Sequence, residues 1–501
     1  MGKGKGIMLQ GTASDVGKTV LCTALCRLFM QDGFRVAPFK AQNMTLNSYV
    51  TADGGEMGTA QALQALAAGV EPRVEMNPIL LKPTGDLEAQ VVVLGKPLAD
   101  MTARGYRRDY LPQARRVVQE CLQELQAGYE LLVAEGAGSC AEVNLRDGDI
   151  VNMFVAETAD LPVVLVADID RGGVFASIIG TLELLTPAER ERVVGIIVNK
   201  FRGDRELFRS GVEFLEEKTG KPVLGVIPYL EHGIAEEDSA SLSRHRARPG
   251  EVEIAVLKLP RIANFTDVQV LSLVPGVSLR YVKGGEAIGP ASAVIIPDTT
   301  NPAADLGYLR AQGYAEELAA LRGQGVPVLG LGAGCYLLGE TLQAGDGTVH
   351  PGLGWLPMAA VLDGPREGVR VEGLVTGTRG KSWQGLEGAP VQGYELRGGR
   401  LSWTGPVQTW VAVNGQEMLF GSEDGLVLGT QLHGVFHNRE LLLAFVNKLR
   451  QTKGLPPLTQ ADCRGLDLEA AFDRLAAGVR PHLNLPLLYQ LMGIPSRDQA
   501  C

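Results

Sequence analysis

A glycine-rich segment near the N-terminus combines the residue types that bind nucleotide phosphates. It reads Gly-Thr-Ala-Ser-Asp-Val-Gly-Lys-Thr over residues 11–19, with five residues between Gly11 and the final Gly-Lys-Thr, one more than in the usual P-loop. Its backbone N–H groups can point at a phosphate, Lys18 supplies positive charge, and the hydroxyl of Thr19 can bind Mg²⁺. An ordinary helix start is the alternative. The predicted nucleotide contacts here are Gly11, Thr12, Asp15, Val16, Gly17, Lys18 and Thr19.

Polar side chains follow a short strand predicted over residues 35–40. Lys40 ends this strand, and Asn43 and Asn47 lie in the loop that comes next. Open parallel sheets bind their ligands at the carboxyl ends of the strands. Each of these side chains could belong to a solvated loop, but together, beside a phosphate site, they indicate contacts with a substrate or a nucleotide.

Carboxylates near the predicted phosphate site are candidates for magnesium ligands. Glu56 or Asp53 could hold Mg²⁺ opposite Thr19, because Mg²⁺ in nucleotide sites takes one or two carboxylates together with phosphate oxygens. Capping of the following helix explains Asp53 about as well, and Glu56 less well. Glu135 comes at the end of an apolar strand that begins at residue 129. An unpaired acid is costly there, so we expect it to face a metal or a substrate.

Apolar strands that alternate with helices predict the fold. Residues 161–168 and 194–199 are typical of buried strands, and Asn199, which ends the second, is predicted to contact a purine ring. The alternation runs through both halves of the chain and predicts two doubly wound α/β domains. The expected divisions are a P-loop domain over 1–235, a charged linker over 236–251, a second α/β domain over 252–445 and a helical tail over 446–501.

Charge and composition exclude several classes of protein. The chain has 501 residues and a net charge of −10, without a pronounced basic cluster, which argues against nucleic acid as a partner. No apolar run is long enough to span a membrane. The first strand is predicted so close to Met1 that we expect no signal peptide, and the seven cysteines lack metal-ligand spacing. We therefore predict a cytoplasmic protein without a zinc site.

Longer motifs in both halves carry a family resemblance. They are Pro38-Phe-Lys-Ala-Gln-Asn-Met, Asp53-Gly-Gly-Glu-Met-Gly, Met76-Asn-Pro-Ile-Leu-Leu-Lys-Pro, Asp168-Ile-Asp-Arg-Gly-Gly and Leu259-Pro-Arg-Ile-Ala-Asn-Phe-Thr-Asp. Through them nearly the whole chain resembles the cobyric acid synthase family. The first half is similar to the ATP-dependent domain related to dethiobiotin synthetase, and the second half to a class-I glutamine amidotransferase.

The resemblance implies a reaction. Members of that family use ATP, Mg²⁺ and ammonia, usually taken from glutamine, to amidate the b, d, e and g carboxylates of adenosylcobyrinic acid a,c-diamide in adenosylcobalamin biosynthesis. Each carboxylate would first become an acyl phosphate, which ammonia then displaces. The resemblance implies that Thr19, Glu56 and Glu135 hold the metal. Lys18 and Lys40 would balance the phosphate charge. The implied substrate contacts are Asn43, Asn47, Lys82, Asn144, Asp168 and Arg171.

The second half departs from the amidotransferase pattern at the residue that does the chemistry. Such domains place a cysteine in a Gly-x-Cys-Gly-Gly turn, where a histidine activates its thiolate. Alignment of residues 328–339 puts Gly332 at that position, and glycine cannot form a thioester. Cys335 lies three residues further on, about one helical turn away. It is better explained as a packed apolar side chain than as a displaced nucleophile.

Two further departures lie in the same predicted site. Asp298 stands where the family has a glycine that helps to form the oxyanion hole, and an acid there would repel a developing negative charge. Arg397 replaces a histidine, whereas His433 keeps the position of the catalytic base. Together these losses predict a degenerate glutaminase. Ammonia would then be used directly or would come from a separate glutaminase protein.

Three other functions stay open at this point. The chain could use glutamine directly, or it could be a cobyrinic acid a,c-diamide synthase, which shares the architecture. The motifs around Lys40 and Asp168 are more similar to those of the four-amide enzymes. A nucleotide-binding scaffold without catalysis is the third alternative. The retention of Lys18, Thr19 and Glu135 argues against it, because a scaffold has no need of all of them.

Overall fold

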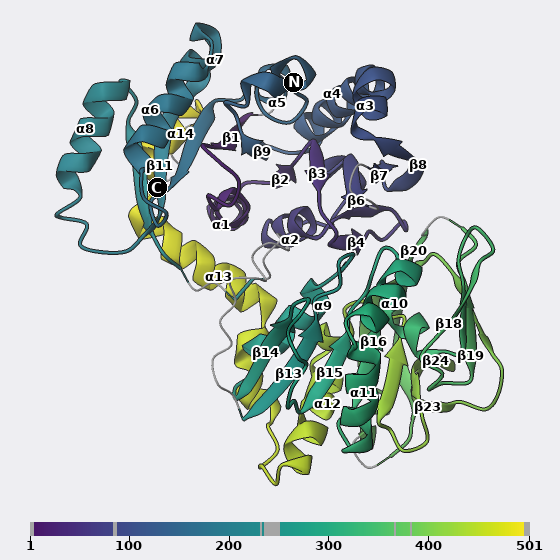
Figure 1. Cartoon of the computed structure of the whole chain (residues 1–501). Helices are drawn as coiled ribbons and strands as arrows, with labels where there is room; N and C mark the ends of the chain where they lie inside the picture. The colour runs from purple at the N-terminus through teal and green to yellow at the C-terminus, as the bar shows by residue number, and fades with distance from the viewer. Residues whose placement is uncertain are drawn as a thin grey trace. The chain divides into compact units, whose positions relative to one another are not determined.

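The computed structural model describes residues 5–83, 88–230, 233–234, 251–364, 367–380 and 383–494. The chain divides into two units, each built from a largely parallel sheet and helices (Figure 1). Unit 1 comprises Met1–Thr45, Gly55–Ile234 and Leu468–Cys501, and unit 2 comprises Leu46–Gly54 and Ala235–Asp467. The predicted fold class, two α/β domains with parallel sheets, is confirmed. The linker predicted over 236–251 lies almost wholly outside the described residues.

Unit 1 is organised around a six-stranded sheet in the order β12-β11-β10-β1-β9-β2, with every neighbouring pair parallel. The strands are β1 (Lys5–Gly11), β2 (Val36–Phe39), β9 (Leu131–Ser139), β10 (Val163–Asp168), β11 (Val193–Phe201) and β12 (Val223–Pro228). The central strands are apolar because both faces of such a sheet are covered, and all six residues of β10 are buried. The parallel pairing brings the carboxyl ends of these strands, with their polar residues, to one edge.

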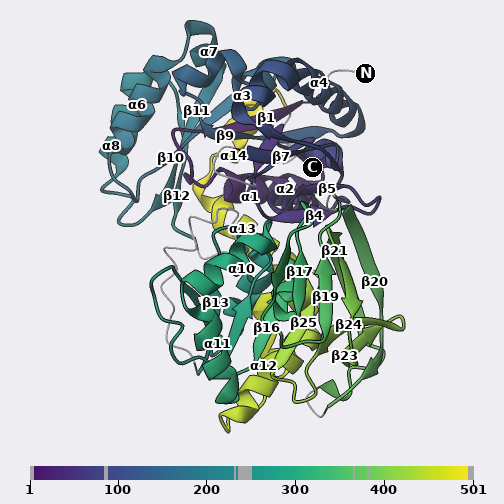
Figure 2. The ribbon, with the colours of Figure 1, turned by 45° about the vertical axis from the view of Figure 1, so that its right-hand side comes forward.

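Helices of unit 1 pack around this sheet, and α1 is the most completely buried of them. It carries apolar residues on nearly every side because the sheet and the helices α2 and α13 all pack against it, and α13 lies beside it in both views (Figure 1, Figure 2). Arg27 of α1 binds Asp473 and Glu469 of α13 at 2.7 and 2.8 Å. The helices are α1 (Lys18–Gln31), α2 (Thr59–Ala67), α3 (Ala103–Gly105), α4 (Leu111–Gly128), α5 (Met153–Thr158), α6 (Val174–Leu184), α7 (Pro187–Arg192), α8 (Arg209–Thr219), α13 (Leu468–Val479) and α14 (Leu485–Leu491).

A second, four-stranded sheet of unit 1 carries residues that follow the predicted site lysine Lys40. Its order is β3-β6-β7-β8, and β3 is parallel to β6, whereas the other pairs are antiparallel. In this register Asn43 of β3 lies opposite Leu80 of β6, two residues before Lys82. The strands are β3 (Gln42–Met44), β6 (Ile79–Pro83), β7 (Glu88–Val93) and β8 (Lys96–Thr102), and the short strands β4 (Ser48–Val50) and β5 (Glu56–Gly58) lie between β3 and β6 in the sequence.

Unit 2 is built on a nine-stranded sheet in the order β14-β13-β15-β16-β25-β24-β23-β20-β21. The first five strands are parallel and the last four antiparallel. They are β13 (Val252–Leu257), β14 (Val277–Val282), β15 (Ala293–Ile296), β16 (Val328–Leu331), β20 (Glu367–Thr378), β21 (Pro390–Arg397), β23 (Gln408–Val413), β24 (Gln416–Gly421) and β25 (Val427–Thr430). The parallel strands are short, apolar runs whose side chains fill the unit's core.

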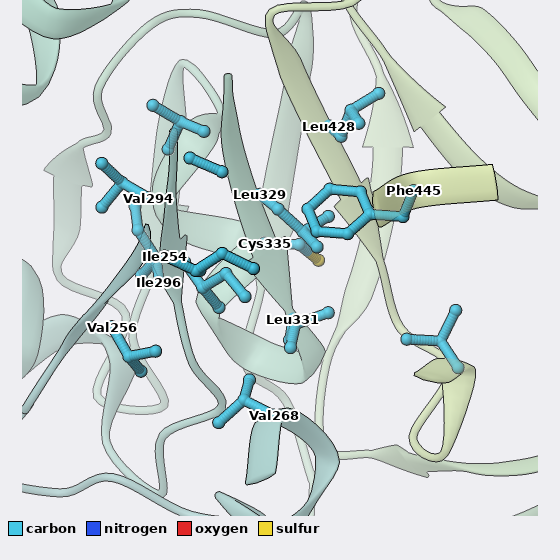
Figure 3. Packing of buried hydrophobic residues seen from close by; sticks show 14 of the residues in the cluster. Ile254, Val256, Val268, Val294, Ile296, Leu329, Leu331, Cys335, Leu428 and Phe445 are labelled. Atoms are coloured by element: carbon cyan, nitrogen blue, oxygen red, sulfur yellow. The ribbon is translucent and has the colours of Figure 1, made fainter. Parts of the chain in front are cut away.

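Helices and a small sheet complete unit 2. The helices are α9 (Thr266–Gln269), α10 (Pro302–Ala311), α11 (Tyr314–Gly323) and α12 (Arg439–Thr452). The small sheet has the order β18-β17-β19-β22, from β17 (Thr341–Gln343), β18 (Val349–Pro351), β19 (Met358–Val361) and β22 (Arg400–Trp403). Figure 3 shows how Phe445 of α12 packs into the core near Leu329 of β16.

The division into units differs from the sequence-based boundaries at two places. Leu46–Gly54 comes early in the sequence but belongs to unit 2, and Leu468–Cys501 returns to unit 1. The boundary predicted between residues 445 and 446 falls inside α12, where both Phe445 and Val446 are buried in the core of unit 2. The predicted tail is therefore two parts with different partners, because its apolar faces pack on different cores.

Membrane-spanning helices, disulfides and metal clusters can be assessed only in the ranges that the structure describes. No helix in them is both long and apolar enough to cross a membrane. Their six cysteines are free thiols. No group of three or more His, Cys, Asp and Glu side chains in these ranges is arranged so that it could hold a metal ion by itself.

Candidate active site

The predicted phosphate loop lies between the end of β1 and the start of α1. Gly17, at the N-cap of α1, has φ = +95°, a left-handed conformation that favours glycine. A Cβ at this position would lie 2.1 Å from Nδ2 of Asn199, which donates a hydrogen bond to the carbonyl of Val16 at 2.8 Å. Asn199 therefore supports the loop from the end of β11, and its predicted contact with a purine ring stays a prediction.

Lys18 is folded into the loop that contains it. Its Nζ donates to the carbonyl oxygens of Ala13 at 3.1 Å and Gly138 at 3.0 Å, so the ammonium group sits between the loop and the end of β9. Burial lowers the pKa of Lys18, and the negative charge of Glu135 acts in the opposite direction. The group is therefore a cation poised at the loop, where phosphate oxygens could replace the carbonyl oxygens as its partners.

Glu135 is the centre of the polar cluster at this edge of the sheet. Its Oε1 accepts from the Thr19 hydroxyl at 2.8 Å and lies 3.0 Å from Nζ of Lys40, and its Oε2 accepts from Nε2 of Gln64 at 2.8 Å. Burial opposes ionisation of this carboxyl, but the charge of Lys40 and the hydrogen bonds from Gln64 and Thr19 outweigh it and hold its pKa below the ordinary value. Glu135 is thus a buried carboxylate.

Gln64 is a site residue that the sequence reasoning missed. It lies on α2, three residues after Gln61, in the sequence Thr-Ala-Gln-Ala-Leu-Gln-Ala-Leu-Ala, and both glutamines are fully buried. Glutamines are seldom buried without a purpose, and two of them on one face of an alanine-rich helix were a usable signal. Nδ2 of Asn43 donates to Oε1 of Gln61 at 2.9 Å, which adds Asn43 to the same region.

A second buried pair lies beside α2. Nζ of Lys82 and Oε1 of Glu56 form a close ion pair, and both residues are 2% exposed. Oε2 of Glu56 has no hydrogen-bond partner although it is buried. Three more buried polar atoms without a partner come from the same stretch, namely Oγ1 of Thr59, Nε2 of Gln61 and Oε1 of Gln64. Buried polar atoms normally have partners, so this concentration indicates a place where a polar ligand binds.

The residues present fit a magnesium ion of the kind found in nucleotide sites. Mg²⁺ is usually held by one or two carboxylates and a hydroxyl together with phosphate oxygens, rather than by a cage of protein ligands. The structure brings two of the three predicted ligands together, the hydroxyl of Thr19 and the carboxylate of Glu135. The third, Glu56, is paired with Lys82 and keeps one buried oxygen without a partner.

Two predicted substrate contacts, Asp168 and Arg171, lie next to the phosphate loop. Oδ2 of Asp168 is 3.0 Å from Nζ of Lys200, which also donates to the backbone carbonyl of Asp15. Nη2 of Arg171 is 3.1 Å from Oδ2 of Asp15. Asp15 itself has φ = +58°. These charges hold the loop to the ends of β10 and β11, so the contacts in the structure are with the loop, and substrate contact stays a prediction.

The other predicted substrate contacts are distributed differently. Asn144 is exposed on the short 3-10 helix Val143–Gly148. Asn47 is fully buried in unit 2, not unit 1, and its Oδ1 accepts from the N–H of Thr266 at 3.4 Å. This separation could not be predicted, because Asn47 lies only four residues after Asn43 in the sequence.

In unit 2, Gly332 occupies the turn that follows β16. It begins the 3-10 helix Gly332–Leu338 and has φ = +53°, the left-handed conformation. A Cβ at this position would lie 2.7 Å from Cε1 of His433 and 2.7 Å from Oδ1 of Asp298. A side chain at position 332 would therefore point at the histidine, which is the geometry of a nucleophile beside its base.

Asp298 fills the region that a side chain at position 332 would face. Its Oδ1 accepts from the N–H of Ala333 at 2.8 Å. The N–H of the residue after a nucleophile commonly helps to form an oxyanion hole. Oδ2 of Asp298 accepts from Nδ2 of Asn264 at 2.8 Å and lies 3.9 Å from Nε2 of His433. The N–H of Ala333 thus already donates its hydrogen bond to the carboxylate of Asp298.

His433 is held by groups on its other side. Its Nδ1 lies 2.7 Å from Oδ2 of Asp267, whose Oδ1 accepts from the N–H of Gly434 at 2.9 Å. The ring of Tyr394 stacks on the imidazole, with 5.1 Å between ring centroids. Asp267 was not predicted as a site residue, although it ends the Leu259–Asp267 motif, and the acid that closes this motif was the available signal.

Cys335 is part of the hydrophobic core. It is fully buried, and Figure 3 shows its side chain among apolar neighbours that include Leu329 and Phe445. Burial and the nearby charge of Asp298 raise the pKa of its thiol well above the ordinary value. Because the thiolate is the nucleophile, these surroundings favour a structural cysteine over a displaced catalytic one.

Comparisons with known proteins match one domain family to each half of the chain. The CobQ/CobB/MinD/ParA nucleotide binding domain matches residues 7–241, and the CobB/CobQ-like glutamine amidotransferase domain matches residues 253–441. The cobyric acid synthase of Desulforamulus reducens is 50% identical over 99% of this chain and 99% of its own length. That of Pelotomaculum thermopropionicum is 49% identical over 98% of this chain and 97% of its own. One solved glutamine amidotransferase structure aligns with 40% of this chain and 98% of its own, at 18% identity and a TM-score of 0.32.

Proposed function

Because the chain belongs to the cobyric acid synthase family, we propose that it amidates the b, d, e and g carboxylates of adenosylcobyrinic acid a,c-diamide with ammonia and ATP. It is an ATP-dependent ligase with a glutamine amidotransferase-like domain. The proposal adds to this the set of carboxylates, the route through acyl phosphates, and ammonia as the direct nitrogen donor.

The polar cluster of unit 1 supports an acyl phosphate route. A carboxylate is a poor acyl donor, so its oxygen would attack the γ-phosphorus of ATP, with ADP as the leaving group. Lys18 and Lys40 supply positive charge beside Glu135, where the phosphates would bind. Mg²⁺, when bound, would neutralise phosphate charge, and Thr19, Glu135 and Glu56 would hold it. Phosphoryl transfer depends mainly on such alignment and charge stabilisation.

The second half-reaction needs ammonia. Its nitrogen would attack the acyl carbon, phosphate would leave, and a proton would be lost to give the neutral amide. Asn43 and Lys82 are placed near α2, where several buried polar atoms have no partner, and would orient the substrate. This region can receive polar groups of the corrinoid side chain.

The observation that carries the choice of nitrogen donor is the geometry around Gly332. Position 332 faces His433 without a side chain, and the carboxylate of Asp298 accepts the hydrogen bond of the Ala333 N–H. Glutamine hydrolysis would need both a thiolate and a free oxyanion donor there. These two features support the use of free ammonia, or of ammonia from a separate glutaminase.

One assay tests the proposal. Purified protein is incubated with the a,c-diamide, ATP and Mg²⁺, in parallel with ammonium and with glutamine, and both amide products and glutamate are measured. We expect four amidations with ammonium and no stoichiometric glutamate with glutamine. Glutamate formed in step with amide would identify a conventional glutamine-using enzyme. Absence of corrinoid-stimulated ATP hydrolysis with ammonium would instead favour a scaffold.

A further inference from the structure

The segment Leu46–Gly54 connects two residues of the synthetase site through unit 2. The chain leaves unit 1 after Thr45, whose N–H donates to the carbonyl of Leu81 at 3.3 Å, and it is back in unit 1 at Gly55. Asn43 lies three residues before the segment and Glu56 two residues after it. Both residues are therefore within three positions of a segment that belongs to unit 2.

Asn264 holds the segment with its backbone and its side chain. Its N–H donates to the carbonyl of Leu46 at 3.0 Å, and its Oδ1 accepts from the N–H of Ser48 at 2.9 Å. Asn264 has φ = +44°, a left-handed conformation that asparagine and aspartate tolerate better than other side chains. The hydroxyl of Tyr394, which stacks on His433, donates to the carbonyl of Ser48.

Asp298 fixes the orientation of that asparagine. Oδ2 of Asp298 accepts from Nδ2 of Asn264, and Oδ1 accepts from the N–H of Ala333. An amide with a donor on one side and a carboxylate on the other has only one favourable orientation. The N–H of Ala333, the Asp298 carboxylate, the Asn264 amide and the N–H of Ser48 thus form one polarised chain of hydrogen bonds, and Asp298, Asn264 and Ser48 are each buried.

We propose that the degenerate glutaminase site serves as the anchor of the segment Leu46–Gly54, with Asp298 and Asn264 as positioning residues for the amidation. The carboxylate that blocks the oxyanion donor would thereby hold the segment that presents Asn43 and Glu56. This role rests on the proposed ammonia-dependent function, because a working glutaminase would need the same N–H of Ala333 for its intermediate.

An exchange of the two side chains tests the proposal. In Asp298→Asn the new amide nitrogen faces Nδ2 of Asn264, so two donors oppose each other. In Asn264→Asp two carboxylates oppose each other. The double variant Asp298→Asn/Asn264→Asp restores an acceptor for Ser48, a donor–acceptor pair between the side chains, an acceptor for Ala333, and the original charge.

Two readouts separate positioning from general stability. The first is hydrogen exchange of peptides that cover residues 46–54. The second is steady-state kinetics with ammonium, together with the Kd of ATP. We expect Asp298→Asn to speed exchange of the segment and to lower kcat/KM for the corrinoid about tenfold or more, because small misplacements of site residues have effects of this size. The Kd of ATP should change by less than about twofold, since residues 11–19 are untouched.

The double variant should return both the exchange rate and kcat/KM to within about threefold of the wild type, since its hydrogen bonds are restored. A double variant that remains as impaired as Asp298→Asn overturns the proposal, and so does an Asp298→Asn protein with wild-type exchange and turnover. If the wild type fails to use ammonium, the proposed function fails, but hydrogen exchange in the three variants still tests the anchor on its own.

Discussion

In both units a glycine with positive φ lies in the turn after a parallel strand, but the side chains around the two turns differ. After β1 the turn ends at Gly17, with φ = +95°, and after β16 it contains Gly332, with φ = +53°. Gly17 makes room for the amide of Asn199, and the next two residues, Lys18 and Thr19, carry the groups that we predict to bind phosphate and metal. Gly332 leaves room for the carboxylate of Asp298 and the imidazole of His433. The next two residues, Ala333 and Gly334, carry no reactive group.

The difference shows that the same kind of turn can be present with or without a reactive side chain. The strand, the left-handed residue and the helix start are needed for packing, because neighbouring strands and helices depend on them. The reactive side chain is not needed for packing. In unit 1 the carboxylate at the strand end, Glu135, is held by a cation and two donors, and in unit 2 Asp298 is held by two amide donors. The first cluster contains the lysine and the hydroxyl of the predicted phosphate and metal site, whereas in the second the carboxylate pairs with donors of unit 2.

The largest effect should come from Lys18→Ala. Without the ammonium group the phosphate charge is not balanced, and we expect ATP-dependent amidation to fall by about 10³-fold or more. Circular dichroism and thermal unfolding should show an intact fold. Lys96→Ala is the matched control, because Lys96 is an exposed lysine of unit 1. If Lys18→Ala kept its activity, the turn after β1 would not differ from the turn after β16 by a side chain that the reaction requires.

Glu135→Gln should reduce both activity and stability. The change removes the carboxylate that pairs with the buried Lys40 and also removes a predicted magnesium ligand. Loss of one partner of a buried ion pair typically costs about 3–5 kcal/mol of unfolding free energy. We expect kcat to fall about 10²-fold, with a higher Mg²⁺ requirement, as measured by a magnesium titration at saturating ATP. If the variant kept the magnesium dependence of the wild type, Glu135 would not be a ligand of the metal.

Gly332→Cys should fail to create a glutaminase. The new Cβ would meet Asp298 and His433 at 2.7 Å, and the backbone conformation disfavours any side chain. We expect a loss of about 2 kcal/mol in unfolding free energy and no glutamate release, because Asp298 still holds the Ala333 N–H. Gly332→Cys/Asp298→Gly should release some glutamate from glutamine. If the single variant hydrolysed glutamine, Asp298 would not be the block that we infer.

The smallest effect concerns pH. The pKa of Glu135 is lower in the folded state than its ordinary value of about 4.3, so the unfolded state binds more protons in the interval between the two. The stabilisation is present above pH 4.3 or so and is lost as pH falls through the folded-state pKa. In urea titrations from pH 7 downwards, the stability difference between wild type and Glu135→Gln should therefore shrink on acidification. A constant difference would contradict the buried carboxylate.

The residues predicted for the synthetase site have local signatures in the sequence, although the site itself stays a prediction. A phosphate loop needs a strand, glycines and a Lys-Thr pair in succession, and residues 7–19 have this order. Lys40, Glu135 and Asn199 each end a strand, and the parallel alternation brings strand ends to one edge. The spacing of Gln61 and Gln64 on an alanine-rich helix could have marked Gln64 as buried, but it could not identify Glu135, far away in the sequence, as its partner.

The sequence by itself determined the two α/β units, the phosphate loop, and the missing side chain at position 332. Only the tertiary structure decided that Asn47 belongs to unit 2, that residues 468–494 belong to unit 1, and that Asp298 accepts from Ala333 and Asn264. The physical reason is the range of the interactions. Turn conformation and strand pattern depend on neighbouring residues, whereas a buried carboxylate takes its role from donors supplied by segments far apart in the chain, which only the folded packing brings together.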